Sequence, residues 1–208
     1  MVELTQLRPH DLLRLAQPLD VVPRSAPFWV SAALGAVPWV VVRRSYASVG
    51  RIAVGVRGAG RTQRFAMEIP DTAVMKVLAP EALVARGSAL KEDVPAARAL
   101  KGAAVLLNGG GLPWGPTGSV GFELASGAPT VTESSDLDLL LRPDGLPARA
   151  ALCRLYCALQ RLPARVDCQI ETDNGALALG ELASGAREVL LRTPTRPRLI
   201  PTPWPRAA

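Results

Sequence analysis

Histidine, cysteine and aromatic residues are all scarce in this 208-residue chain. There is one histidine, there are three cysteines, and aromatic side chains make up 4% of the sequence. The cysteines, Cys153, Cys157 and Cys168, are odd in number and lack the paired spacing of a metal site, so we expect free, reduced thiols. With few rings on which bases could stack, the sequence does not indicate nucleic acid as a partner.

The sequence also lacks the features of a membrane protein. The uncharged stretch from Ala26 to Val42 is shorter than the roughly 20 residues that a span requires, and Gly35 and Pro38 divide it. The first residues contain acids early and have no basic segment followed by an apolar one, so we expect no secretory signal. These absences predict a cytoplasmic protein without a membrane span.

Acidic residues are missing from one long part of the chain. No Asp or Glu lies between Val21 and Met67, and the whole sequence has a formal net charge of +6. That span contains seven arginines: Arg24, Arg43, Arg44, Arg51, Arg57, Arg61 and Arg64. Composition alone is compatible with an ordinary solvated surface, although guanidinium groups also bind phosphate and carboxylate in a fork.

Three of these arginines are candidate binding residues. Arg57, Arg61 and Arg64 alternate with glycines in "VGVRGAGRTQRF", where backbone N–H groups can approach a ligand closely. The segment is not a P-loop, because it lacks the Gly-Lys-Ser/Thr ending.

The remaining composition is that of a folded protein with helices and strands. The hydrophobic fraction is 49% and the charged fraction is 20%. The pattern predicts an α+β fold, with a small basic α/β domain at residues 1–87 and a mixed sheet with flanking helices at 88–208. The expected helices are Pro9–Gln17, Phe28–Leu34, Thr72–Leu83, Ala96–Leu107 and Pro147–Leu162, with a helical turn at 177–184. The expected strands are Trp39–Arg43, Arg51–Val56, 61–69, Val120–Leu124, Leu137–Leu141, Arg165–Glu171 and Glu188–Arg192.

Two aspartates interrupt the apolar run "SDLDLLLR". Residues two apart in a strand point to the same face, so Asp136 and Asp138 would lie together while Leu137 and Leu139 face a core. Adjacent carboxylates repel each other, and a divalent cation such as Mg²⁺ or Mn²⁺ removes that conflict. The alternative is the polar face of an edge strand, or a turn cap at Asp136.

The neighbouring motifs favour a metal site. Gly118 and Ser119 form a turn that suits phosphate, and Asp167 lies on a later strand whose alternation could place it beside the pair. A Gly-Ser turn, an Asp-x-Asp pair and a later strand Asp, in this order, are the pattern of the nucleotidyltransferase superfamily that includes DNA polymerase β. Sixteen residues separate Ser119 from Asp136, which is longer than is usual there and predicts an added loop or hairpin.

Motifs along nearly the whole chain resemble one family within that superfamily. They are "PHDLLRL", "WVVVRR", "VGVRGAGRTQRFA", "GPTGSVGFELASG", "SDLDLLLR" and the terminal "PWP". They are similar to the phosphoribosyl-dephospho-CoA transferases, the malonate decarboxylase holo-[acyl-carrier protein] synthases. The resemblance implies transfer of 2′-(5″-triphosphoribosyl)-3′-dephospho-CoA to a serine of the acyl-carrier protein subunit of malonate decarboxylase, with release of pyrophosphate.

The resemblance also suggests roles for the candidate residues. Two Mg²⁺ or Mn²⁺ ions would be held by Asp136, Asp138 and Asp167, and the terminal phosphates by Gly118 and Ser119. Some of Arg57, Arg61 and Arg64 would bind the triphosphate or the acidic carrier. Glu123 and Glu171 are further possible ligands. A nucleotidyltransferase for another carrier or a small hydroxyl substrate has the same motif, and a non-enzymatic basic protein that binds polyanions is a more distant alternative.

Overall fold

The computed structural model describes residues 7–60, 62–91 and 93–204, and the chain divides into two compact units. The first unit contains residues 1–79 with 125–128, and the second contains 80–124 with 129–208. The candidate residue Arg61 lies outside the described residues. The α+β class expected from the sequence is confirmed, since each unit joins helix to a sheet that contains antiparallel strands.

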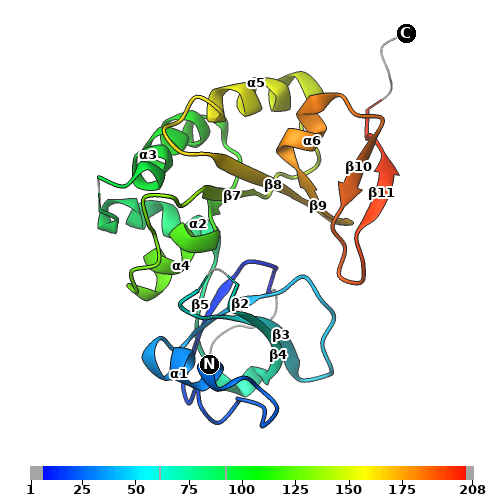
Figure 1. Cartoon of the computed structure of the whole chain (residues 1–208). Coiled ribbons are helices and arrows are strands. Elements are labelled where there is room, and N and C mark those ends of the chain that lie inside the picture. Colours follow the sequence, from blue (N-terminus) through cyan, green and yellow to red (C-terminus); the bar gives the residue numbers. More distant parts are fainter. Residues whose placement is uncertain (1–6, 61, 92, 205–208) are drawn as a thin grey trace. The chain divides into compact units, whose positions relative to one another are not determined.

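The first unit is built on a five-stranded sheet in which every neighbouring pair is antiparallel (Figure 1). The strand order is β4-β3-β2-β1-β5, and helix α1 (Phe28–Ala36) belongs to the same unit. The strands are β1 (Leu12–Leu15), β2 (Trp39–Val42), β3 (Arg51–Arg57), β4 (Arg64–Pro70) and β5 (Val74–Leu78). Val30 and Leu34 of α1 are buried with the apolar residues of β1 to β4, which forms the core of the unit.

Two expectations for this unit are wrong. The helix expected at Pro9–Gln17 is strand β1, which lies between β2 and β5 and buries Leu12, Leu13 and Leu15. Three of its four residues are buried leucines, and such a short apolar run cannot be told from a helix segment by periodicity alone. The helix expected at Thr72–Leu83 is a 3₁₀ turn followed by β5, and only α2 (Pro80–Leu83) is helical, since Val74 and Val77 pair with β1.

The second unit has a four-stranded sheet in the order β6-β7-β8-β9, and a separate hairpin of β10 and β11. β7 and β8 are parallel, whereas the outer pairs are antiparallel. The strands are β6 (Trp114–Pro116), β7 (Leu137–Leu141), β8 (Val166–Thr172), β9 (Gly175–Ala178), β10 (Glu188–Leu191) and β11 (Arg198–Pro201). Helices α3 (Pro95–Leu107), α5 (Arg149–Leu159) and α6 (Leu179–Ser184) lie on one side of this sheet (Figure 1).

The strand expected at Val120–Leu124 is instead part of helix α4 (Gly118–Ser126). Gly118 has a φ of +58°, and the amide of Gly121 donates to the carbonyl oxygen of Thr117, so the chain turns directly from β6 into a helix. A side chain at position 121 would collide with the Pro116 carbonyl group. This glycine therefore allows the first turn of α4 to pack against β6, a tertiary constraint that propensity does not reveal.

An ion pair between a buried arginine and a half-buried glutamate joins α2 to the residue that follows β7. Arg142 is 5% exposed, and its Nη1 donates to both carboxylate oxygens of Glu81 at 2.9 Å. We expect Arg142→Met to lower the free energy of unfolding by about 2–3 kcal/mol, because the half-buried Glu81 loses the charged donor of two hydrogen bonds. Urea denaturation measures the change.

The control for that prediction is Arg51→Met. Arg51 pairs with Glu68 at 3.4 Å, but both side chains are more than a third exposed, so its loss should cost less than about 1 kcal/mol. Equal effects of the two substitutions would show that the Arg142 pair contributes no more than a surface pair.

No helix among the described residues is both long enough and apolar enough to span a bilayer. The uncharged stretch at Ala26–Val42 forms α1 and β2 of the first unit.

Candidate active site

Asp138 and Asp167 lie directly opposite each other on the two central strands of the second unit. In the parallel register of β7 and β8, Leu137 faces Val166, Asp138 faces Asp167, and Leu139 faces Cys168. Neighbouring strands lie about 4.8 Å apart, so the two carboxylates leave the sheet side by side on the same face. Asp138 is half-buried and Asp167 is exposed.

Asp136 immediately precedes β7 and is half-buried. The chain enters it from a closed turn, in which the Thr132 amide donates to the Ser135 hydroxyl and the Ser135 amide donates to the Thr132 carbonyl. If the extended alternation of β7 continues back to Asp136, its Cα lies about 6.5 Å from that of Asp138 on the same face. This turn therefore fixes the direction from which the chain enters Asp136 and then β7.

Gly118 lies against the carboxylate of Asp138. A Cβ atom built at Gly118 would be 1.7 Å from Asp138 Oδ2 and 2.7 Å from its Cγ, so no other residue fits without moving this carboxylate. The backbones are joined as well, because the Thr117 amide donates to the Asp138 carbonyl oxygen at 2.8 Å. The structure therefore brings the glycine turn and the second aspartate of the Asp-x-Asp motif into direct contact.

The first turn of α4 is placed beside this carboxylate by the same contact. The N-terminal amides of a helix point along its axis and carry partial positive charge, an arrangement that binds anions. Ser119 is half-buried in this turn, and its carbonyl oxygen accepts a hydrogen bond from the Thr130 hydroxyl. Gly118 and Ser119 thus stand at a helix N-terminus next to Asp138.

The two glutamates considered as extra ligands have other positions. Glu123 accepts hydrogen bonds from the amides of Thr130 and Val131, both at 2.7 Å. These bonds hold the segment between α4 and Asp136 against the helix. Glu171 lies four residues beyond Asp167 on β8, which is about 13 Å along an extended strand. Glu171 is therefore too far away to share an ion with Asp167.

Arg165 is a candidate site residue that the sequence analysis did not name, although its position in the chain indicates it. It lies two residues before Asp167, and its carbonyl oxygen accepts the Leu137 amide at 2.8 Å, so it neighbours Asp136 where the strands meet. Arg165 is exposed and, with Asp167, lines a cavity of about 250 Å³. The alternation that grouped the acids places this cation on their side of the sheet.

The glycine-rich arginine segment belongs to the first unit and forms the β3–β4 hairpin. Arg57 and Arg64 are paired across the two strands. The Gly58 amide donates to the Gln63 carbonyl and the Gly60 amide to the Gln63 side chain. These two amides are therefore engaged within the hairpin, and so is the Arg64 guanidinium, which donates to the carbonyl oxygens of Gly60 and Gln63.

Of the three cysteines, Cys168 is the one next to a candidate catalytic residue. It is buried on β8, and burial raises the pKa of its thiol, with the charge of the neighbouring Asp167 adding to the rise. The thiol stays neutral and packs as a small apolar group. Cys153 and Cys157 are also free.

The donor set at this site fits a hard cation. Carboxylate oxygen is the ligand that Mg²⁺ and Mn²⁺ prefer, and Asp138 and Asp167 present it from adjacent strands. In the part of the chain that the structure describes, no three His, Cys, Asp or Glu side chains are gathered closely enough to hold an ion unaided. Mg²⁺ is commonly bound by one or two carboxylates together with substrate phosphates, and the paired aspartates suit that mode.

Known proteins match both units. The N-terminal domain of phosphoribosyl-dephospho-CoA transferase MdcG matches residues 8–80, and its C-terminal domain matches residues 82–203. A phosphoribosyl-dephospho-CoA transferase of Pseudomonas aeruginosa is 47% identical over 197 residues, which cover 94% of this chain and 93% of that protein. Proteins of the same name from Pseudomonas putida strain GB-1 and Azotobacter vinelandii are each 44% identical, covering 95% of this chain and 95% and 94% of their own lengths. No solved structure matches the chain.

These matches identify the protein as an enzyme, and its class as a transferase. The chain belongs to the phosphoribosyl-dephospho-CoA transferase family, as its motifs indicated.

Proposed function

We propose that this enzyme transfers 2′-(5″-triphosphoribosyl)-3′-dephospho-CoA to a serine of the apo acyl-carrier protein subunit of malonate decarboxylase, in the cytoplasm. The observation that carries the proposal is the pairing of Asp138 with Asp167, with the Asp138 carboxylate against Gly118 at the start of α4. This arrangement offers oxygen ligands and an anion-binding helix end at one place. Those are the two needs of phosphoryl chemistry on a triphosphate.

In the proposed reaction, the serine Oγ forms a bond to the α-phosphorus of the donor. The bond between that phosphorus and the oxygen bridging to the β-phosphate breaks, and pyrophosphate leaves with the electron pair. The serine proton passes to a carboxylate oxygen of Asp167, the exposed member of the pair. The products are a phosphodiester on the carrier and free pyrophosphate.

The residues of the site divide this work. Asp136, Asp138 and Asp167 would hold the Mg²⁺ or Mn²⁺ ions, one or two in number, which when bound neutralise phosphate charge and favour the serine alkoxide. The amides of Gly118 and Ser119 hold terminal phosphate oxygens. Arg165 places a fixed positive charge beside the acids, where it offsets charge that develops on the leaving pyrophosphate.

The direct test is intact-mass analysis of the apo carrier subunit after incubation with the donor, Mg²⁺ and this enzyme. The expected result is a single mass increase equal to the prosthetic group, together with one pyrophosphate per modified carrier. Modification of a different carrier protein or of a small hydroxyl compound, with none of this carrier, would replace the proposed acceptor. Salt-sensitive binding of polyanions without any transfer would contradict an enzyme of this kind.

The arginines of the first unit are expected to contribute in two ways. An arginine that binds the triphosphate acts at short range, so Arg57→Ala should lower kcat about tenfold or more, and we expect the same of Arg61→Ala and Arg64→Ala. An arginine that attracts an acidic carrier acts at long range, so Arg43→Ala or Arg44→Ala should raise KM for the carrier and weaken its salt dependence. Steady-state kinetics at two salt concentrations measure both effects.

Arg51→Ala is the matched control, because Arg51 is already paired with Glu68. Wild-type kinetics for every variant at both salts would mean that the basic character of the first unit is only compositional.

A further inference from the structure

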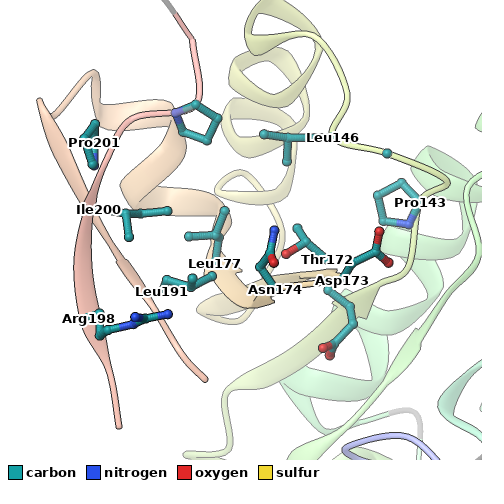
Figure 2. Close-up of a pocket in the computed structure, with 13 residues that line it drawn as sticks. Pro143, Leu146, Thr172, Asp173, Asn174, Leu177, Leu191, Arg198, Ile200 and Pro201 are labelled. Carbon is teal, nitrogen blue, oxygen red and sulfur yellow. The ribbon is translucent and has the colours of Figure 1, made fainter. Parts of the chain in front are cut away.

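A second cavity of the catalytic unit lies away from the paired aspartates. Its volume is about 540 Å³, within the range of small-molecule sites. The turn between β8 and β9, the segment between β7 and α5, and the β10–β11 hairpin enclose it (Figure 2). The proposed reaction assigns no role to this space.

The base of the cavity is apolar. Leu177 of β9 and Leu191 of β10 are buried beneath it, and half-buried Leu146 and Ile200 line its walls (Figure 2). Each is an aliphatic side chain without polar atoms. Such a surface favours methyl and methylene groups of a ligand over a hydrated charge.

The polar groups around this base favour an uncharged ligand over a phosphate. Glu171 and Asp173 contribute two carboxylates, whereas Arg198 contributes the one cation of the lining, on the opposite side from Asp173 (Figure 2). The balance is negative, which disfavours an anion. Asn174 adds an amide that can both donate and accept hydrogen bonds, so the lining suits an uncharged group that carries amides or hydroxyls.

The cavity also has a defined position relative to the acids. Glu171 reaches its lining from the same face of β8 as Asp167, about 13 Å further along the strand. A long ligand whose reacting phosphate lies at Asp138 and Asp167 could therefore extend along β8 into the cavity.

We infer that this cavity binds the pantetheine arm of the donor, an inference that rests on the proposed function. The arm is uncharged, combines two amides with methyl and methylene groups, and is separated from the triphosphate by the whole nucleotide. The apolar base takes its aliphatic part, while Asn174 and Asp173 accept hydrogen bonds from its amide groups. The triphosphate remains at the other end of β8.

The test compares the Kd of dephospho-CoA with that of ADP, its fragment without the arm, for the full-length enzyme without carrier. We expect dephospho-CoA to bind about tenfold more tightly or better. Asn174→Trp fills the cavity from an exposed turn position, and should remove this advantage while leaving the Kd of ADP unchanged. Ala150→Trp adds the same ring at an exposed position of α5 outside the cavity and should behave as wild type.

Turnover gives a second measure. With donor and apo carrier, Asn174→Trp should raise KM for the donor about tenfold at unchanged kcat, since the reacting phosphate is held elsewhere. The inference is overturned if dephospho-CoA binds no better than ADP, if Asn174→Trp leaves its affinity intact, or if that variant weakens both probes equally. Failure of the wild-type enzyme to modify the carrier would overturn the proposed function instead, and the binding comparison separates the two results.

Discussion

Asp138→Asn is expected to lower the rate of prosthetic-group transfer by at least about 10³-fold while leaving the protein folded. Asparagine has the same shape but cannot supply a charged oxygen to a cation. Stability should not fall, because Asp138 faces Asp167 in register and like charges directly opposite destabilise a sheet. Asp136→Asn should have a similar effect on the rate. Transfer is measured by intact mass with saturating Mg²⁺, and folding by the Tm of each variant.

Asp144→Asn is the matched control, since Asp144 is an exposed acid beyond the end of β7. It should transfer at the wild-type rate. Turnover of Asp138→Asn within a few-fold of wild type would rule out a metal site at the paired aspartates.

Gly118→Ala is expected to reduce transfer about 10²-fold, because a displacement near 1 Å at a reacting centre has effects of this size. The added methyl group would occupy the position of Asp138 Oδ2, so the carboxylate must swing away from the start of α4. Alanine at a φ of +58° also costs about 1 kcal/mol of stability. The two effects are separable, since one concerns the acid and the other the backbone.

Gly127→Ala separates them. Gly127 has a φ of +76°, and nothing lies within 4 Å of a Cβ built there, so this variant carries the backbone strain without displacing any group. It should lose a similar amount of stability and keep its activity. If Gly118→Ala and Gly127→Ala transfer equally well, the contact between glycine and carboxylate has no catalytic role.

The sequence predicted well those helices and strands that bury one face and expose the other. The stripe of α3, which buries Ala96, Leu100, Ala103 and Leu107, is read directly from helical periodicity. The prediction at Pro9–Gln17 was wrong because the short leucine run of β1 shows no clear period. The prediction at Val120–Leu124 was wrong because Gly121 allows a helix to pack against Pro116. For β1 the deciding contacts are its pairings with β2 and β5, which come from distant parts of the chain that a local pattern does not contain.

The sequence predicted which residues belong to the candidate site better than it predicted how they are arranged. Alternation placed Asp136 with Asp138, and the family motif supplied Asp167 and Gly118. The register that sets Asp138 opposite Asp167 depends on how two strands separated by α5 are aligned, and no short segment encodes it. Arg165 could have been found, because the strand expected at Arg165–Glu171 already placed it on the face of Asp167.

The Glu81–Arg142 pair has a practical consequence for anyone who wishes to express the C-terminal part alone. A fragment that begins at Pro80 keeps α2 and the carboxylate that neutralises Arg142, whereas a fragment that begins at residue 88 leaves this guanidinium buried without its acid. The second fragment would also uncover Gly115, against whose backbone Pro80 and Glu81 are packed. We therefore expect the fragment that begins at Pro80 to be more stable than one that begins at residue 88, because only the first keeps both contacts of α2.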